Sequence, residues 1–162
     1  METYSFLQTN DPYFLTPPEL VQAKLELLNL EDGEVLCDLG VGDGRSLIAG
    51  CEQAKVTAIG YEVLPEAMVT AQKNIDAANL THRIELIEGS MYDADVSQVN
   101  ALLLYLSRTM LGGLSLKLEN ELPAGARIVT HEFDLPGWVI LQEKEITLSN
   151  GDWYTIYLFR KP

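Results

Sequence analysis

The sequence predicts an α/β fold in which a mostly parallel sheet is covered by helices on both faces. Stretches with the two-residue period of a strand alternate with stretches of helical period from residue 34 to residue 133. Such alternation places successive strands parallel, through right-handed crossovers. The chain then ends in two strand-like runs around Asn150-Gly151, a dipeptide typical of tight hairpins. We therefore expect an antiparallel hairpin at the C-terminal end of the sheet.

The strands and helices can be assigned in order along the chain. Apolar and β-branched runs predict strands at residues 34–39, 55–62, 83–89, 101–106 and 127–133, followed by the two hairpin arms within 143–160. The first helix is expected within 16–30, where Thr16 and Glu19 have the spacing of a capping box. Three later helices are indicated by apolar residues at helical spacing: Leu47, Ile48, Cys51 and Ala54; Met68, Ala71, Ile75 and Ala78; and Leu111, Leu114, Leu118 and Leu122.

Length and composition indicate a single domain spanning residues 1–162. The first residues have neither the basic start nor the apolar centre of a signal peptide, and no apolar run approaches the roughly 18 residues that cross a bilayer. We therefore expect a soluble, cytoplasmic protein with no membrane partner. Cys37 and Cys51 lie in apolar patterns without His or Cys at metal-ligand spacing, so we expect core thiols and no metal site.

The charge balance constrains the partner. Asp and Glu outnumber Lys and Arg by 24 to 11, which gives a formal net charge of −13. Proteins that bind nucleic acid usually do so through a basic face. We therefore expect no nucleic-acid partner and favour a basic one, although many acidic proteins carry such a charge only for solubility.

The stretch CDLGVGDGR, residues 37–45, places three glycines at alternate positions directly after the first predicted strand. In an open α/β sheet, ligands bind at the carboxyl ends of the strands, where the first strand turns into its helix. Glycines there let the backbone approach a ligand closely, because no Cβ intervenes. The loop therefore predicts a ligand site rather than only a tight turn.

Glu62 ends the second predicted strand, where nucleoside-binding α/β folds place an acid that accepts both ribose hydroxyls. The glycine spacing is G-x-G-x-G, and Arg45 replaces the third glycine of the dinucleotide pattern. Asp38 would also repel a pyrophosphate, whereas it would attract a ligand that carries an ammonium and a sulfonium. S-adenosylmethionine is such a ligand, and we expect it to be the cofactor.

Several segments together resemble a known family. VLCDLGVGDGR, GYE and the terminal hairpin look like the class I, seven-strand S-adenosylmethionine-dependent methyltransferases, which have a Rossmann-like fold. DPYFLTPPELV, DLGVGDGR and KLENELPAGARIVTHEFDLPGW, in that order, resemble the small protein-lysine methyltransferases of archaea and their mitochondrial relatives. The resemblance covers nearly the whole chain. It implies the transfer of methyl groups to lysine side chains of proteins.

The resemblance also implies roles for residues around the glycine loop. Asp38, Gly40, Gly42 and Gly44 correspond to the loop that holds the methionine end of the cofactor, and Glu62 corresponds to the ribose acceptor.

Two further segments match the cofactor site of the family. Ser90 and Met91 correspond to the adenine side, where relatives often carry Asp or Asn, so Ser90 departs from the pattern. Tyr13 and Thr16 correspond to a segment that covers the cofactor. For Thr16 the capping box is an alternative explanation.

The end of the fourth predicted strand reads LLLYLSRTM and lacks the Asn/Asp-Pro-Pro-aromatic motif of enzymes that methylate nucleobase amines. A protein amine therefore fits better. Tyr105 and Trp138 are the candidate catalytic residues, because aromatic walls favour a cationic amine. His131 and Glu132 alternate along a strand, so at most one of them faces the cleft. We interpret both as structural.

Two alternative functions remain open at this point. The chain could methylate a small molecule, although it has few residues beyond the predicted strands and helices to cover such a substrate. It could also bind the cofactor without catalysis and serve as an interaction module. The glycine loop and Glu62 are expected in either case.

Overall fold

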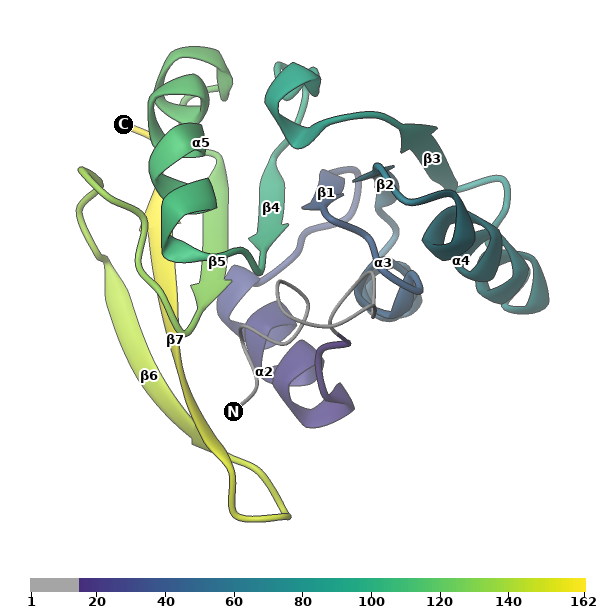
Figure 1. The fold of residues 1–162 in the computed structure, drawn as a ribbon, viewed down its shortest axis with the longest axis horizontal. Coiled ribbons are helices and arrows are strands. Elements are labelled where there is room, and N and C mark those ends of the chain that lie inside the picture. The colour runs from purple at the N-terminus through teal and green to yellow at the C-terminus, as the bar shows by residue number, and fades with distance from the viewer. Residues whose placement is uncertain (1–14) are drawn as a thin grey trace.

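A computed structural model of the chain describes residues 15–162, so the predicted cofactor residue Tyr13 lies outside the described part. Figure 1 shows the arrangement of its elements. They are α2 (Pro18–Leu28), β1 (Val35–Leu39), α3 (Arg45–Gln53), β2 (Thr57–Glu62), α4 (Pro65–Ala77), β3 (Ile84–Glu88), the 3-10 helix η1 (Met91–Asp93), β4 (Ala101–Leu104), α5 (Arg108–Glu121), β5 (Arg127–His131), β6 (Gln142–Thr147) and β7 (Trp153–Arg160).

The strands form one seven-stranded sheet in the order β3-β2-β1-β4-β5-β7-β6. The first five in this order pair in parallel, whereas β7 is antiparallel to both β5 and β6. The chain turns between β6 and β7 at Gly151, which has a φ of 92°, and Asn150 Oδ1 accepts a hydrogen bond from Asp152 N. The predicted seven-strand, mostly parallel sheet with an antiparallel hairpin is confirmed.

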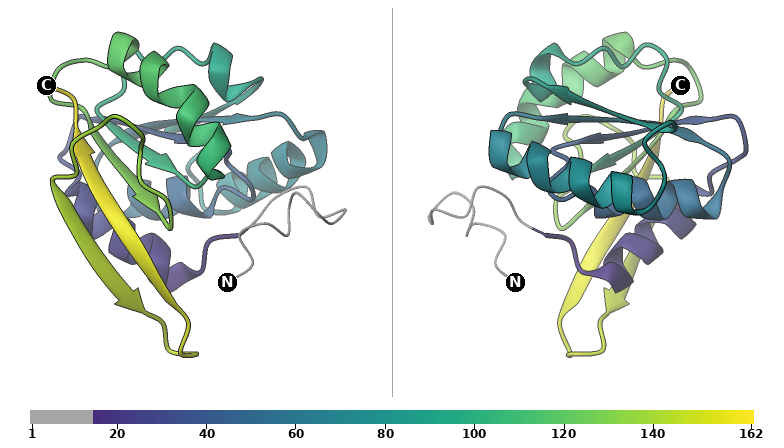
Figure 2. Two further views of the ribbon diagram at one scale, coloured as in Figure 1. Left: turned by 60° about the vertical axis from the view of Figure 1, so that its left-hand side comes forward. Right: turned by 90° about the vertical axis from the view of Figure 1, so that its right-hand side faces the viewer.

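Helices cover both faces of the sheet, as Figure 2 shows. Alternate residues of β4 serve the two faces. Leu102 and Leu104 pack in one cluster with the leucines of α5, whereas Leu103 packs in another cluster with apolar residues of α2, α3 and α4. This division follows from the two-residue period of a strand. Both faces of β4 are therefore buried, and a ligand can reach this central part of the sheet only at the strand ends.

The start of α2 corrects the predicted capping box. The N-cap is Pro17, and no side chain within residues 15–162 caps the start of the helix. A residue that precedes a proline is held extended, and Pro17 has a ψ of 144°, so the helix cannot begin before Pro18 and Thr16 lies one position too early. The carboxylate of Glu19 instead accepts hydrogen bonds from the backbone N and the Oγ of Ser149. It thereby ties α2 to the hairpin.

β4 and β5 each end two residues earlier than the sequence suggested. β4 stops at Leu104 and β5 at His131. Glu132 follows β5 with a φ of 75°, which is a left-handed conformation that interrupts a regular ladder. The residues beyond these two strand ends therefore lie on the rim of the sheet. Among residues 15–162, no helix combines the length and the apolar character needed to traverse a membrane.

Candidate cofactor and acceptor site

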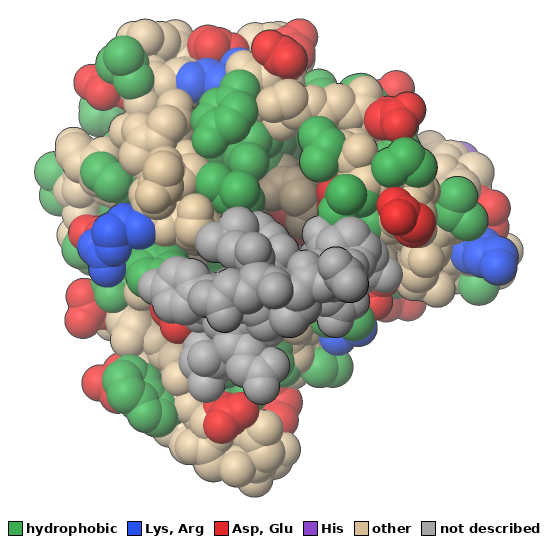
Figure 3. Space-filling view, viewed as in Figure 1, with side chains coloured by type: hydrophobic (Ala, Val, Ile, Leu, Met, Phe, Trp, Pro, Cys, Tyr) green, Lys and Arg blue, Asp and Glu red, His purple; other side chains and the backbone are tan. Residues whose placement is uncertain are grey.

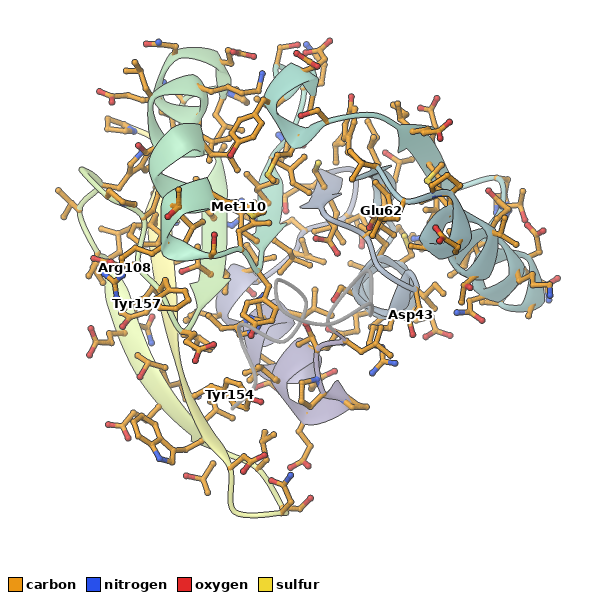
Figure 4. The ribbon with its side chains drawn as sticks, viewed as in Figure 1. Asp43, Glu62, Arg108, Met110, Tyr154 and Tyr157 are labelled. Atoms are coloured by element: carbon orange, nitrogen blue, oxygen red, sulfur yellow. The ribbon has the colours of Figure 1, made fainter. Side chains whose placement is uncertain are left out.

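A cavity opens at the carboxyl ends of β1, β2 and β4. Its lining includes Asp38 and the loop after β1, Glu62 at the end of β2, and Tyr105 after β4. Figure 4 labels Glu62 on β2 and Met110 near the start of α5, and both residues line the cavity. The cavity is therefore where an open α/β sheet is expected to bind its ligand.

The loop between β1 and α3 has a conformation that requires glycine. Gly40, Gly42 and Gly44 all have positive φ angles, of 97°, 61° and 86°. Gly40 and Gly42 line the cavity. Gly44 does not appear in the lining; it is the N-cap of α3, and a Cβ there would lie 3.4 Å from Ala71 Cβ of α4. The first two glycines therefore serve the cavity, whereas the third allows α3 and α4 to pack closely.

Glu62 joins the loop to the end of β2. Its side chain is buried, with 6% of its surface exposed. Oε1 accepts a hydrogen bond from Gly42 N at 2.9 Å, and Oε2 accepts from Val63 N and Leu64 N at 3.1 and 3.3 Å. A carboxylate offers about four acceptor positions. Glu62 can therefore fix the loop and still accept a ligand hydroxyl.

Arg45 connects the loop to the segment before α2. Its guanidinium contacts both oxygens of Asp43, with an Nη2–Oδ2 distance of 2.8 Å, and its Nη1 donates to the carbonyl oxygen of Thr16 at 3.0 Å. Thr16 lines the cavity. The structure thus brings Thr16 to the cofactor cavity without any capping role, through an arginine contact that sequence reasoning missed.

The two residues predicted for the adenine side separate in the structure. Met91 lines the cavity. Ser90 is not among the lining residues, and its Oγ accepts a hydrogen bond from Tyr92 N at the start of η1. The backbone turn after β3, rather than the Ser90 hydroxyl, therefore borders the cavity on this side.

The two predicted catalytic residues also separate. Tyr105 lines the cavity. Its hydroxyl lies 3.2 Å from Glu132 Oε2, and its ring stacks on His131 with centroids 3.7 Å apart. Trp138 is not among the lining residues. Its indole N–H donates to Ser115 O of α5 at 3.2 Å, and its ring meets Phe159 edge to face. The structure therefore keeps Tyr105 in the site and gives Trp138 a packing role.

Lys24 is a cavity residue that sequence reasoning missed. It lies on α2 with 4% of its surface exposed, and its Nζ lies 3.2 Å from Leu104 O and 2.8 Å from His131 Nδ1. The signal was available, because Leu20, Lys24 and Leu28 follow each other at i, i+4 spacing on the apolar face of the helix. A lysine on such a face needs an explanation.

Burial and charge shift the proton equilibria of this cluster. Burial lowers the pKa of Lys24 to about 8, and the charge of Asp38 partly opposes the shift. Burial also raises the pKa of Asp38 to about 7, while Lys24 lowers it and the charges of Glu62 and Asp43 raise it. Burial, and then the charge of Lys24, hold the pKa of His131 well below its usual value. His131 is therefore neutral at pH 7, and its Nδ1 accepts from the Lys24 ammonium.

The arrangement fits S-adenosylmethionine. Gly40 and Gly42 expose backbone to the cavity, Glu62 offers carboxylate oxygens to a ribose, and Met91 provides an apolar surface beyond β2. Asp38 is buried at the end of β1, and although burial raises its pKa to about 7, an adjacent ammonium or sulfonium would favour its charged form and be attracted to it. These residues match what an adenosine with a charged amino-acid chain requires.

Comparison with known proteins agrees with this geometry. The sequence model of the ANTKMT methyltransferase domain matches residues 38–142, from the last residues of β1 to the first residue of β6. The chain belongs to the ANTKMT methyltransferase family. The predictions of a class I methyltransferase fold, of methyltransferase activity and of S-adenosylmethionine as cofactor are thereby confirmed.

Three relatives of this ANTKMT-family chain are informative. It is 33% identical over 151 residues to a protein-lysine N-methyltransferase of Saccharolobus islandicus, covering 91% of this chain and 92% of that protein. It is 30% identical to the adenine nucleotide translocase lysine N-methyltransferase of Mus musculus, covering 82% of this chain but 57% of the mouse protein. A crystal structure described as an RNA methyltransferase from Salinibacter ruber, in complex with S-adenosyl-L-homocysteine, superimposes with a TM-score of 0.84 at 30% identity, covering 92% and 94% of the two chains.

Proposed function

We propose that this chain transfers a methyl group from S-adenosylmethionine to the side-chain amine of lysine in a protein. The observation that carries the proposal is the cavity itself, which joins the glycine loop and Glu62 at one end to Tyr105 at the other. The similarity to a protein-lysine N-methyltransferase over nine-tenths of both chains supports the same substrate class. The cofactor-binding end and the acceptor end of the cavity therefore belong to one site.

Within this site, Gly40, Gly42, Glu62 and Met91 would hold the cofactor. When bound, the cofactor supplies an electrophilic methyl group on a positively charged sulfur, which becomes a neutral thioether as the bond to the amine nitrogen forms. The chain must keep the sulfur, the methyl carbon and the amine nitrogen in line, which is a matter of positioning. The loop backbone, which takes its shape from the positive φ angles of Gly40 and Gly42, would hold the cofactor in this alignment.

The acceptor lysine must lose a proton before it can attack. Presenting a neutral amine at pH 7 costs about 4–5 kcal/mol, given a reference pKa of about 10.4. Removal from water beside a sulfonium lowers a lysine pKa, so we assign no general base. His131 is a poor candidate for that role, because its Nδ1 is bonded to Lys24 and its buried Nε2 has no hydrogen-bond partner among residues 15–162.

Tyr105 is our candidate for contact with the acceptor amine. It lines the cavity, and stacking on His131 together with the Glu132 contact holds its ring in place. An aromatic ring attracts a cationic amine and its methylated product. Trp138, which packs against α5 and Phe159, has no such part in this proposal.

The partner we propose is a basic protein surface. The net charge of −13 favours such a partner. Figure 3 shows acidic side chains spread over the visible face, with few basic ones between them. The expected cytoplasmic location and the absence of nucleic-acid and membrane partners stay predictions.

RNA is the second candidate acceptor, because the Salinibacter ruber protein is described as an RNA methyltransferase. The acidic charge of this chain weighs against it, since RNA binding favours basic surfaces. A small metabolite is the third candidate acceptor. A single labelling experiment can separate the three classes.

The experiment incubates the protein with S-adenosylmethionine that carries a radioactive methyl group and with a cell lysate. Label is then followed through gel filtration, protease digestion and ribonuclease digestion. We expect labelled macromolecules that are sensitive to protease and resistant to ribonuclease, and weaker labelling with the Glu62→Gln variant. Label that is released by ribonuclease, or that is found only in small metabolites, would contradict the proposal.

A further inference from the structure

Among the described residues that line the cavity, the basic side chains are Lys24 and Arg45. The Arg45 guanidinium is bound to the Asp43 carboxylate, so its charge is already matched next to it. Lys24 takes part in none of the ion pairs among residues 15–162. Within the part of the chain that the structure describes, Lys24 is therefore a cavity cation with no carboxylate in direct contact, and Asp38 acts on it only through its charge.

The bonding of Lys24 leaves a donor available. An ammonium carries three N–H groups. Leu104 O accepts one of them and His131 Nδ1 accepts another. Within residues 15–162 the third has no partner, and the side chain lines the cavity. Burying an ammonium with an unused donor costs free energy unless a ligand supplies the missing acceptor.

The position of Nζ in the sheet tells which part of the ligand it would meet. Glu62, the ribose acceptor, ends β2, and Lys24 Nζ contacts Leu104 O at the end of β4. β1 lies between these strands and carries Asp38. A ligand that places its ribose at Glu62 and its adenine towards Met91 after β3 extends its remaining end past Asp38 towards Lys24.

We propose that Lys24 binds the carboxylate of the cofactor's amino-acid end, while Asp38 beside it binds the ammonium. The inference rests on the proposed function, because it assigns one more contact within the same cofactor site. Opposite charges on the two side chains match the two charges of an amino acid. Without Lys24, the cofactor's carboxylate would meet the acidic groups Asp38 and Glu62, while the other basic residue of the described lining, Arg45, is already paired with Asp43.

The surroundings of Lys24 support this role. His131 is neutral and accepts from Nζ, so it orients the ammonium without competing for its charge. Burial lowers the pKa of Lys24 to about 8, so the ammonium form still predominates at pH 7. A carboxylate brought next to it would favour the charged form further.

The test measures binding by calorimetry at pH 7 with two ligands, S-adenosylhomocysteine and its decarboxylated form, which lacks only the carboxylate. For the native protein we expect the decarboxylated ligand to bind roughly 10- to 100-fold more weakly, the range for losing a hydrogen bond between charged groups. In the Lys24→Met variant, the affinity for S-adenosylhomocysteine should fall by a similar factor. The affinities for the two ligands should then lie within about twofold of each other. Methionine is unbranched and suits the apolar face of α2.

Matched controls separate this inference from the proposed function. Lys117→Met removes a lysine of α5 that is paired with Glu121 and should change neither affinity. Glu62→Gln should lower the affinity for both ligands by the same factor, because both carry the ribose. Equal affinities of the native protein for the two ligands would overturn the role of Lys24 while leaving the cofactor site in place, even if Lys24→Met fails to fold. No binding of S-adenosylhomocysteine by the native protein would overturn the proposed function as well.

Discussion

The two ends of the cavity are held together in different ways. At the loop end, backbone groups make most of the contacts, and Gly42 N reaches Glu62, which lies 20 positions along the chain. At the acceptor end, side chains make the contacts over long separations: the Tyr105 hydroxyl lies near Glu132, and the Tyr105 ring stacks on His131, whose Nδ1 contacts Lys24 across 107 positions. The loop end therefore depends on backbone conformation, and the acceptor end depends on which side chains the fold brings together.

The loop end should be the more sensitive to substitution. Gly42→Val places a branched side chain at a φ of 61° in the cavity wall, so we expect cofactor binding to fall below detection. Calorimetry with S-adenosylhomocysteine measures this. The matched control is Gly125→Val, because Gly125 has a φ of 86° and open space around it, outside the cavity. If Gly42→Val folds and binds as the native protein does, the loop is only a turn.

Glu62→Gln should have the second-largest effect on cofactor binding. A hydrogen bond to a charged group contributes about 1.5–3 kcal/mol, so affinity for S-adenosylhomocysteine should fall roughly 10- to 100-fold. Glu88→Gln is the control, since Glu88 ends the neighbouring strand in register with Glu62 and is exposed. Equal losses in the two variants would show a general charge effect and would remove Glu62 from the ribose site.

At the acceptor end, Tyr105→Ala should lower methyl transfer while leaving cofactor affinity within about threefold of native. Loss of a cation–π contact of about 0.5–2 kcal/mol corresponds to a decrease of about 3- to 30-fold in kcat/KM. Tyr105→Phe keeps the ring and its stacking on His131, and should retain most of the activity. A variant Tyr105→Ala with native activity would exclude Tyr105 from the acceptor site.

The contrast between the two ends also explains what could be predicted from the sequence. Glu62 and the glycine loop were identifiable because strand period and local spacing place them at neighbouring strand ends. The proline pair at 17 and 18 overrode the capping pattern of Thr16, because conformational restriction by proline decides where a helix starts. The contact between Lys24 and His131 could not be predicted, since it depends on how α2 crosses the sheet.

The contacts of Trp138 also could not be predicted from the sequence. Substitution of Trp138 should have the smallest effect on methyl transfer. As an aromatic residue near a strand end it looked like an acceptor wall, but its indole N–H bonds to Ser115 O instead. Trp138→Phe should lower the free energy of unfolding by about 1 kcal/mol, the typical contribution of one hydrogen bond, with methyl transfer nearly unchanged. Urea denaturation and a transfer assay measure the two quantities. A large loss of transfer in a stably folded variant would return Trp138 to the acceptor site.

The identity of the methylated residue tests the proposed function most directly. A lysine-rich protein is incubated with S-adenosylmethionine and either the native chain or the Gly42→Val variant, then digested and sequenced by tandem mass spectrometry. We predict methyl groups on lysine side chains with the native chain and none with the variant. Methyl groups found only on arginine or on carboxylates would contradict the assignment of lysine as the acceptor.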